Sequence, residues 1–232
     1  MTKRYHSDLE PLARAGDLAR SLLTATGAAY RVSFHAPPPR TDLISFDPEH
    51  GRVFPDAKGA AQRNVEFVGA LSLGDGLVLR RWLPEDAPSI AVACDDAEIA
   101  RWLPVPSPYT VEDARSYLAR VEAWWELGQA YALAISDGPS ILGAISIRPN
   151  SDRPSIGYWL ASSARGRGIV TRAVDTLVVW AAAAFGLSDV WIFAQPDNVA
   201  SCRVARRAGF VEQDERVLFS DGKPRAVFRR QL

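Results

Sequence analysis

The sequence has little of what binding to nucleic acids, membranes or structural metals usually requires. Its 27 Lys and Arg residues are balanced by 27 Asp and Glu residues, so the formal net charge is zero. A balanced charge argues against a general nucleic-acid or membrane-surface binder, because both usually carry a basic excess. Cysteine occurs only at Cys94 and Cys202, without the spacing of a metal site. We therefore expect no metal, no nucleic-acid partner and a thiol-reducing cytoplasmic setting.

Long apolar runs are also scarce. A helix that crosses a bilayer needs about 20 apolar residues, and the longest run here, LVVWAAAAFGL from Leu177, is shorter and predicts a buried helix. The N-terminal residues lack the continuous apolar segment of a secretory signal, so neither secretion nor a membrane partner is expected. Hydrophobic residues nevertheless make up 47% of the 232 residues, which is enough for a substantial core.

The first 70 residues carry patterns of their own. A helical stripe and two short strands are predicted there, the strands in LISFDPEHGRVFP around a turn at residues 47–51. The stripe consists of Leu12, Ala15, Ala19 and Leu22. Residues 69–76, GALSLGDG, are typical of a linker. We therefore expect an N-terminal α/β extension over residues 1–70 and a second domain over residues 71–232.

The second part alternates between strand and helix patterns. Thr110, followed three residues later by Asp113, is typical of a capped helix start. Asp221-Gly222 indicates a closing hairpin. Strands are predicted at 77–82, 130–136, 141–148, 155–161 and 189–195, and helices at 85–101, after Thr110, at 169–185 and at 198–208. This order predicts an α/β (α+β) fold with one sheet flanked by helices.

The stretch ARGRGIVTRA, residues 164–173, joins a predicted strand to a predicted helix. The free N–H groups at a helix N-terminus bind anions, and the absent side chains of Gly166 and Gly168 would allow a close approach. Arg165 and Arg167 would add positive charge. The stretch lacks the spacing of a dinucleotide fingerprint or a P-loop. By pattern alone, a phosphate site and a basic surface turn are equally compatible with it.

The order of the elements, together with two motifs, resembles the GNAT superfamily of acyl-CoA-dependent N-acyltransferases. RGRGIVT after IGYWLA is similar to the family's pyrophosphate loop, with Val170 in place of the usual small residue. DNVASCRVARRAGF is similar to the family's Asn-x-x-Ser…Gly-Phe block. LRRWLPEDAPSI and the C-terminal stretch resemble the RimJ/RimL-type branch, typified by ribosomal-protein N-terminal acetyltransferases. The resemblance covers about residues 71–232 and implies a mixed, mostly antiparallel central sheet.

The resemblance implies acetyl-CoA as acyl donor and assigns most residues of its site. Backbone N–H groups of the loop would bind the pyrophosphate, the strand end would pair with the pantetheine arm, and the Leu160 N–H would stabilise the oxyanion. Asn198 would contact pantetheine and Ser201 would protonate the leaving thiolate, although both residue types are also ordinary helix caps. The implied donor site comprises Trp159, Leu160, Ala161, Arg165, Gly166, Arg167, Gly168, Ile169, Val170, Thr171, Asn198 and Ser201.

The base and the acceptor are less defined. Members of the branch often carry Glu at the position where this chain has Ser155. A serine hydroxyl cannot serve as an efficient general base. Either a chain of water molecules or a carboxylate elsewhere deprotonates the amine, or the protein is inactive. Trp102 and Tyr109 are candidate walls of the acceptor site. The resemblance thus implies an N-acetyltransferase that acts on a small-molecule or peptide amine by direct attack in a ternary complex. A catalytically silent acyl-CoA-binding module is the alternative, and the neutral charge disfavours RNA binding.

The extension is expected to serve the acceptor side. The second domain already contains every element that the acyl-donor site requires. About 70 residues form only a marginal core alone, so the apolar stripe must be buried against other surface. The second domain and a second subunit of a homodimer are the two candidate partners.

Overall fold

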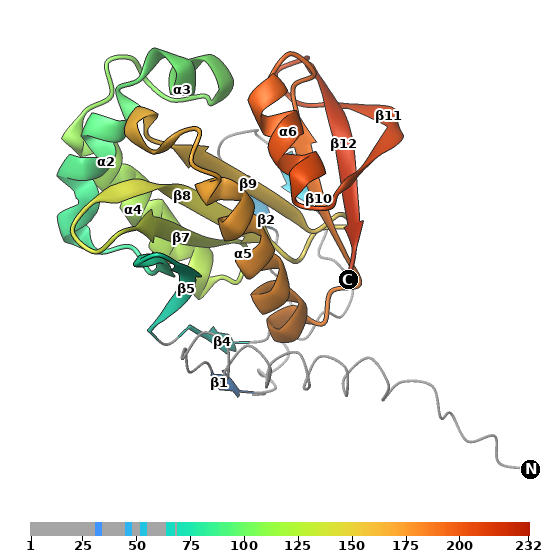
Figure 1. The fold of residues 1–232 in the computed structure, drawn as a ribbon, viewed down its shortest axis with the longest axis horizontal. Helices are drawn as coiled ribbons and strands as arrows, with labels where there is room; N and C mark the ends of the chain where they lie inside the picture. Colours follow the sequence, from blue (N-terminus) through green and yellow to red (C-terminus); the bar gives the residue numbers. More distant parts are fainter. Residues whose placement is uncertain (1–30, 34–44, 48–51, 55–63, 68) are drawn as a thin grey trace, which may run out of the picture.

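The computed structural model describes residues 31–33, 45–47, 52–54, 64–67 and 69–232 (Figure 1). Its centre is an eight-stranded sheet in the order β11-β12-β10-β9-β8-β7-β6-β5. Every neighbouring pair in this sheet is antiparallel except β9 and β10. The predicted mixed, mostly antiparallel sheet is therefore confirmed. The predicted N-terminal helical stripe lies outside the described residues.

The elements follow the predicted alternation. The strands of the sheet are β5 (Ala70–Gly74), β6 (Leu77–Arg80), β7 (Tyr131–Ser136), β8 (Ile141–Arg148), β9 (Ser155–Leu160), β10 (Asp189–Ala194), β11 (Val211–Leu218) and β12 (Pro224–Gln231). The helices are α2 (Ala87–Cys94), α3 (Ala97–Trp102), α4 (Val111–Glu126), α5 (Ile169–Phe185) and α6 (Val199–Arg207), with short 3₁₀ turns η1 (Pro84–Asp86) and η2 (Ser162–Ala164). Short strands β1 (Arg31–Ser33), β2 (Ser45–Asp47), β3 (Arg52–Phe54) and β4 (Asn64–Glu66) precede them.

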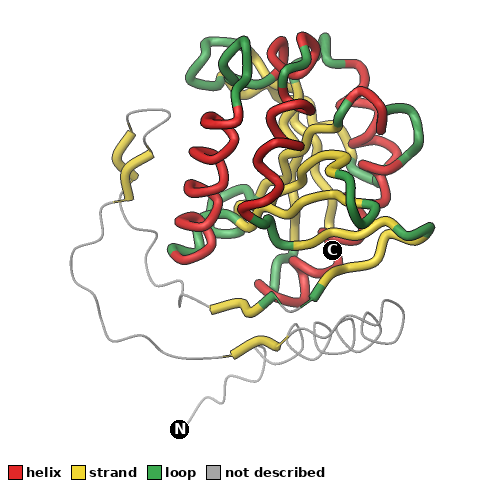
Figure 2. The backbone as a smooth tube through the Cα atoms, turned by 90° about the vertical axis from the view of Figure 1, so that its left-hand side faces the viewer, coloured by secondary structure: helices red, strands yellow, loops and turns green. Residues whose placement is uncertain are grey.

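Helices cover both faces of the sheet (Figures 1 and 2). α5 and α6 pack against each other and against the strands on one face, while α2 and α4 pack together against β8 and β7 on the other. Every residue of β7 is buried, as expected for a strand covered on both sides. The main core lies under α5, where Trp180 and Leu177 are fully buried, and a smaller one around Ile90 lies under α2.

Three local predictions are confirmed. β2 and β3 form the antiparallel pair expected around residues 47–51. Thr110 caps α4, because its hydroxyl accepts the Asp113 N–H and the Asp113 carboxylate accepts the Thr110 N–H at 2.9 Å. β11 and β12 form the expected closing hairpin around Asp221-Gly222. Each of these depends on residues close together in the chain.

Two local predictions are wrong. Residues 69–76 are not a linker, because Ala70–Gly74 forms β5, which pairs with β6 and buries Leu71 and Leu73 in the core. Residues 85–101 are not one helix, because the helical conformation is interrupted between α2 and α3. Asp96 takes an extended conformation there and caps α3 by accepting the N–H groups of Glu98 and Ile99.

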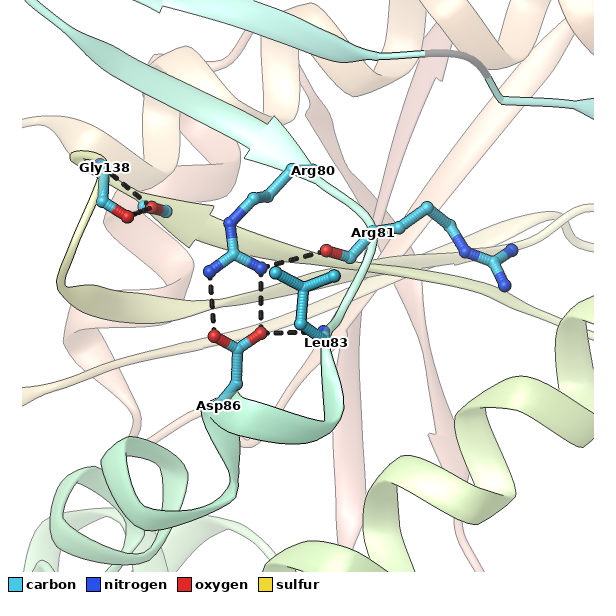
Figure 3. A network of polar contacts seen from close by, with 6 residues as sticks. Arg80, Arg81, Leu83, Asp86 and Gly138 are labelled. Atoms are coloured by element: carbon cyan, nitrogen blue, oxygen red, sulfur yellow. Dashed lines mark hydrogen bonds and ion pairs between the residues drawn. The ribbon is translucent and has the colours of Figure 1, made fainter.

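A nearly buried ion pair fixes the connection from β6 to α2 (Figure 3). The two terminal nitrogens of Arg80 each contact one carboxylate oxygen of Asp86 at 2.8 Å, and Asp86 also accepts the Leu83 N–H at 2.9 Å. The Asp86 side chain is only 9% exposed. The hydrogen bond that the Arg80 guanidinium donates to Asp86 raises the pKa of Arg80. The pair therefore holds the first turn before α2 against the sheet.

Replacing Asp86 by Ala should lower the free energy of unfolding by about 3 kcal/mol, because it leaves the Arg80 charge and the Leu83 N–H without their acceptor. Urea denaturation would measure the change. The matched control is Glu122→Ala, which breaks the more exposed pair with Arg81 and should cost under about 1 kcal/mol. Equal losses in the two variants would contradict the role given to Asp86.

Candidate active site

The sheet opens between β9 and β10. These strands share one paired position, Ser155 with Trp191, and the Trp191 N–H donates to the Pro154 carbonyl at 2.8 Å. On its other edge β9 stays paired with β8 along its whole length. The strands therefore diverge from Ser155 onward, and no strand of the described residues pairs with this edge of β9 beyond that position.

The free edge of β9 points N–H groups into this opening. The Ala161 N–H donates to the Leu142 carbonyl on β8 at 2.9 Å. Successive N–H groups of a strand alternate between its two edges. The Leu160 N–H therefore points away from β8 and toward β10, which is the direction required of an oxyanion donor.

A cavity of about 460 Å³ occupies the opening. It is bounded by β9, β10, the loop before α5, the first turn of α5, one face of α6 and α3. Its lining includes Glu98, Trp102, Tyr158, Trp159, Leu160, Arg165, Gly166, Gly168, Ile169, Val170, Thr171, Phe193, Asn198, Ser201, Arg203, Arg207 and Arg225. Of the predicted donor-site residues, the cavity brings together all except Ala161 and Arg167.

The glycine loop leaves open space at the start of α5. Gly166 and Gly168 have φ values of 77° and 71°, in the left-handed region that favours glycine. A Cβ added at either position would meet no atom of the described residues within 4 Å. Gly168 precedes α5 directly, so the unpaired N–H groups of the first helical turn lie beside this space. The arrangement suits an anion that contacts backbone N–H groups.

Arg165 is engaged with the protein itself. Its guanidinium donates to Asp96 Oδ1 at 3.0 Å and to the Leu160 carbonyl at 3.3 Å. The Arg165 hydrogen bond is the main cause of the lowered pKa of Asp96. Since Asp96 also caps α3, Arg165 ties the glycine loop to the helix that carries Trp102. A direct contact between Arg165 and an anion stays a prediction.

Asn198, Ser201 and Tyr158 meet in the cavity wall. The Asn198 side chain accepts the Ser201 N–H at 2.9 Å and so caps α6. The Ser201 Oγ lies 2.9 Å from the Tyr158 Oη, which is also 3.3 Å from the Ser201 carbonyl oxygen. Burial raises the pKa of Tyr158 to about 12, so the phenol is protonated at neutral pH. Ser201 therefore holds a hydroxyl partner in the site, in addition to its place at the start of α6.

Tyr158 was not singled out in the sequence. The sequence signal that could have found it is the alternation of side chains along β9. Trp159 packs against the cluster of α2 and α4, and Tyr158 packs on the opposite face of the sheet, with α5. That alternation gives the face of each residue but not its partner. Ser201 is 43 positions away in the chain, and only the packing of α6 beside β9 brings the two hydroxyls together.

Of the two residues predicted for the acceptor site, only one lies at the cavity. Trp102 lines the cavity, and its Nε1–H donates to Glu98 Oε1 at 2.7 Å. Tyr109 does not line the cavity and packs against the cluster around α2. Ser155 lies at the closed end of the opening and does not line the cavity either. Glu98 is the one carboxylate in the lining among the described residues, and sequence reasoning missed it.

Among the residues that the structure describes, no helix is both long and apolar enough to cross a bilayer. No group of three or more His, Cys, Asp and Glu side chains is arranged there to hold a metal ion.

Comparisons with known proteins agree with this geometry. Residues 76–211 match the family described as an acetyltransferase (GNAT) domain. The ribosomal-protein-serine acetyltransferase of Escherichia coli is 32% identical over 103 residues, which cover 43% of this chain and 58% of that protein. The match confirms the resemblance to the RimJ/RimL-type branch that the sequence motifs indicated.

Solved structures share the fold. The microcin C7 self-immunity acetyltransferase MccE, solved with acetyl-CoA and AMP, superimposes with a TM-score of 0.63 at 19% identity over 71% of this chain and 97% of its own. The ribosomal L7/L12 α-N-protein acetyltransferase RimL, solved with coenzyme A, superimposes with a TM-score of 0.63 at 23% identity. The match covers 71% of this chain and 98% of RimL. Because the family model spans more than half of the sequence, this chain belongs to the GNAT acetyltransferase family.

Proposed function

We propose that this protein transfers an acetyl group from acetyl-CoA to a primary amine by direct attack in a ternary complex. The observation that carries the proposal is the opening between β9 and β10, which joins an anion site at the glycine loop to a hydroxyl pair at α6 within one cavity. An acyl-CoA matches these two ends, because its pyrophosphate and its thioester lie at opposite ends of the pantetheine arm.

The donor would bind through backbone groups. The N–H groups of Arg167 to Thr171 would hold the pyrophosphate at the positive end of α5. Within Trp159 to Ala161, the backbone groups of Leu160 lie on the free edge of β9 and would pair with the amides of the pantetheine arm, as a further strand pairs with a sheet edge. This arrangement directs the thioester toward Leu160 and Ser201. The chain's own residues thus orient the donor without a covalent intermediate.

The acyl transfer would proceed in balanced proton steps. The neutral amine attacks the thioester carbon, and the Leu160 N–H stabilises the oxyanion. When the C–S bond breaks, Ser201 gives its hydroxyl proton to the thiolate. In this step the Tyr158 hydroxyl, 2.9 Å from the Ser201 Oγ, would be the donor of their hydrogen bond and so keep the serine proton directed into the cavity. The proton released by the amine passes to Glu98 or to water, and water returns a proton to Ser201, which restores its hydroxyl.

The acceptor is proposed to be a small-molecule or peptide amine. The relatives named as ribosomal-protein acetyltransferases support a protein N-terminus. Glu98 in the cavity lining would attract the amine in its cationic form, with the Trp102 indole beside it. We place the reaction in the cytoplasm, in keeping with Cys94 and Cys202 as free, buried thiols.

Amine-dependent release of CoA tests this function. The protein would be incubated with acetyl-CoA and a panel of peptides that differ in their first residue, and free thiol would be followed over time. Thiol release with at least one peptide is expected, while the same peptide with a blocked N-terminus should give none. Acetyl-CoA binding without thiol release from any amine would favour the alternative, a catalytically silent acyl-CoA-binding module.

A shortened chain tests the proposed division at about residue 70. Phe67 packs edge-to-face on Trp125 and Trp180 at 5.9 and 5.6 Å between ring centroids, so the shortened chain should keep it and begin at residue 66. We expect unchanged acetyl-CoA affinity, together with lost amine selectivity, a lost dimer contact or lower solubility. Calorimetry and sedimentation would measure these. A folded, monodisperse short chain that no longer binds acetyl-CoA would assign the extension to the donor site instead.

A further inference from the structure

α6 turns two arginines toward the cavity. Arg203 and Arg207 both line it and are four positions apart, which puts them on one face of the helix. Within the part of the chain that the structure describes, neither has a hydrogen bond or an ion pair. Arg206 differs, because it is paired with Glu212 at 2.7 Å and lies over the Phe228 ring outside the cavity lining.

The charged residues around the cavity leave a surplus of positive charge on the face of α6. Among the described residues, four arginines and one carboxylate line the cavity. Arg165 is neutralised by Asp96, and Arg225 is neutralised by Asp221 at 2.6 Å. The remaining lining carboxylate, Glu98, lies on α3, so the charge of the α6 face is that of Arg203 and Arg207. This pair suits a ligand group that carries about two negative charges at neutral pH.

We propose that Arg203 and Arg207 bind the 3′-phosphate on the ribose of CoA. This inference rests on the proposed acyl-CoA donor, which carries two kinds of phosphate. The pyrophosphate is a diester with one charge on each phosphorus, and backbone N–H groups at the glycine loop suit it. The 3′-phosphate is a monoester dianion, and two guanidinium groups suit it better because each can donate two parallel hydrogen bonds.

The placement of the two sites fits one ligand. α5 and α6 pack against each other, and the first turn of α5 lines the same cavity as Arg203 and Arg207. The ribose that carries the 3′-phosphate is attached directly to the pyrophosphate. A ligand held at the N-terminus of α5 therefore brings its second phosphate group to the neighbouring helix. The consequence is a donor site that distinguishes CoA from its analogue without the 3′-phosphate.

Calorimetric titration of the full-length protein with CoA and with 3′-dephospho-CoA, at fixed low salt, tests the proposal. The parent should bind CoA about tenfold more tightly, because the contacts are charge-assisted but exposed to solvent. Replacing both residues, Arg203→Ala with Arg207→Ala, should reduce that ratio to under about twofold and leave the affinity for dephospho-CoA unchanged. Arg206→Ala is the matched control and should keep the full ratio. Circular dichroism would verify that each variant is folded.

Other outcomes overturn the proposal in distinguishable ways. Equal binding of the two ligands by the parent would reject a 3′-phosphate site. A tenfold ratio that survives the double substitution would place that site on other residues. Weakening of both ligands to the same extent would assign the arginines to another part of the donor. If neither ligand binds the parent, the proposed acyl-CoA function fails first, and this inference fails with it.

Discussion

Replacing Gly168 by Glu should abolish acetyl-CoA binding while the chain remains folded. The new side chain would fill the open space before α5 and put a negative charge where the pyrophosphate is proposed to bind. Like-charge contact with the ligand costs several kcal/mol, so we expect affinity to fall about 100-fold or more. Calorimetric titration with acetyl-CoA would measure the loss, and thermal unfolding would verify the fold.

The chain offers a matched control for this substitution. Gly222 in the closing hairpin also has a φ of 71° and open space around its Cβ position, and it lies outside the cavity lining. Gly222→Glu therefore imposes the same left-handed strain, about 1–2 kcal/mol, without touching the donor site. It should lower stability to a similar degree and leave acetyl-CoA affinity unchanged. Tight binding by the Gly168 variant, or equal loss in both variants, would reject the loop as the pyrophosphate site.

Local patterns predicted the fold well where a residue's neighbours in the chain decide its structure. The cap at Thr110 and the closing hairpin are of this kind. Two errors arose where a glycine-rich or polar stretch was given too much weight against another local signal. GALSLGDG was read as a linker from its glycines, although the alternation of Leu71 and Leu73 is a strand signal. The Asp95-Asp96 pair interrupts an apolar helical pattern, and Asp96 proves to be a helix cap.

The site was predictable from the sequence only through its motifs. The glycine loop and the block around Asn198 and Ser201 are short, contiguous stretches, and their resemblance to the family located them. The contacts between those stretches were not predictable. Arg165 meets Asp96 across 69 positions, and no periodicity of either segment indicates the partner. The packing of α3 and α6 around the opening in the sheet produces such pairs, so they follow from topology rather than from local sequence.

Replacing Ser201 by Ala should lower turnover far more than it weakens acetyl-CoA binding. A proton donor acts in the transition state, and general acids typically contribute about 10²–10⁴-fold to the rate. Turnover would be measured as amine-dependent CoA release with the most active peptide of the panel, and affinity by calorimetry. Unchanged turnover would leave Ser201 with its structural role at the start of α6, where Asn198 binds its N–H.

Tyr158→Phe separates direct from indirect contributions to the same step. The variant keeps the ring that packs under α5 and removes only the hydroxyl 2.9 Å from the Ser201 Oγ. We expect turnover to fall about tenfold, which is the loss of one hydrogen bond in a partly buried site. The double variant with Ser201→Ala should be no slower than Ser201→Ala alone, because Tyr158 acts through the serine. Additive losses would mean instead that Tyr158 contacts the donor or the acceptor itself. Because the pKa of Tyr158 is about 12, the phenol keeps its proton up to about pH 11, so its contribution should be constant across the neutral range.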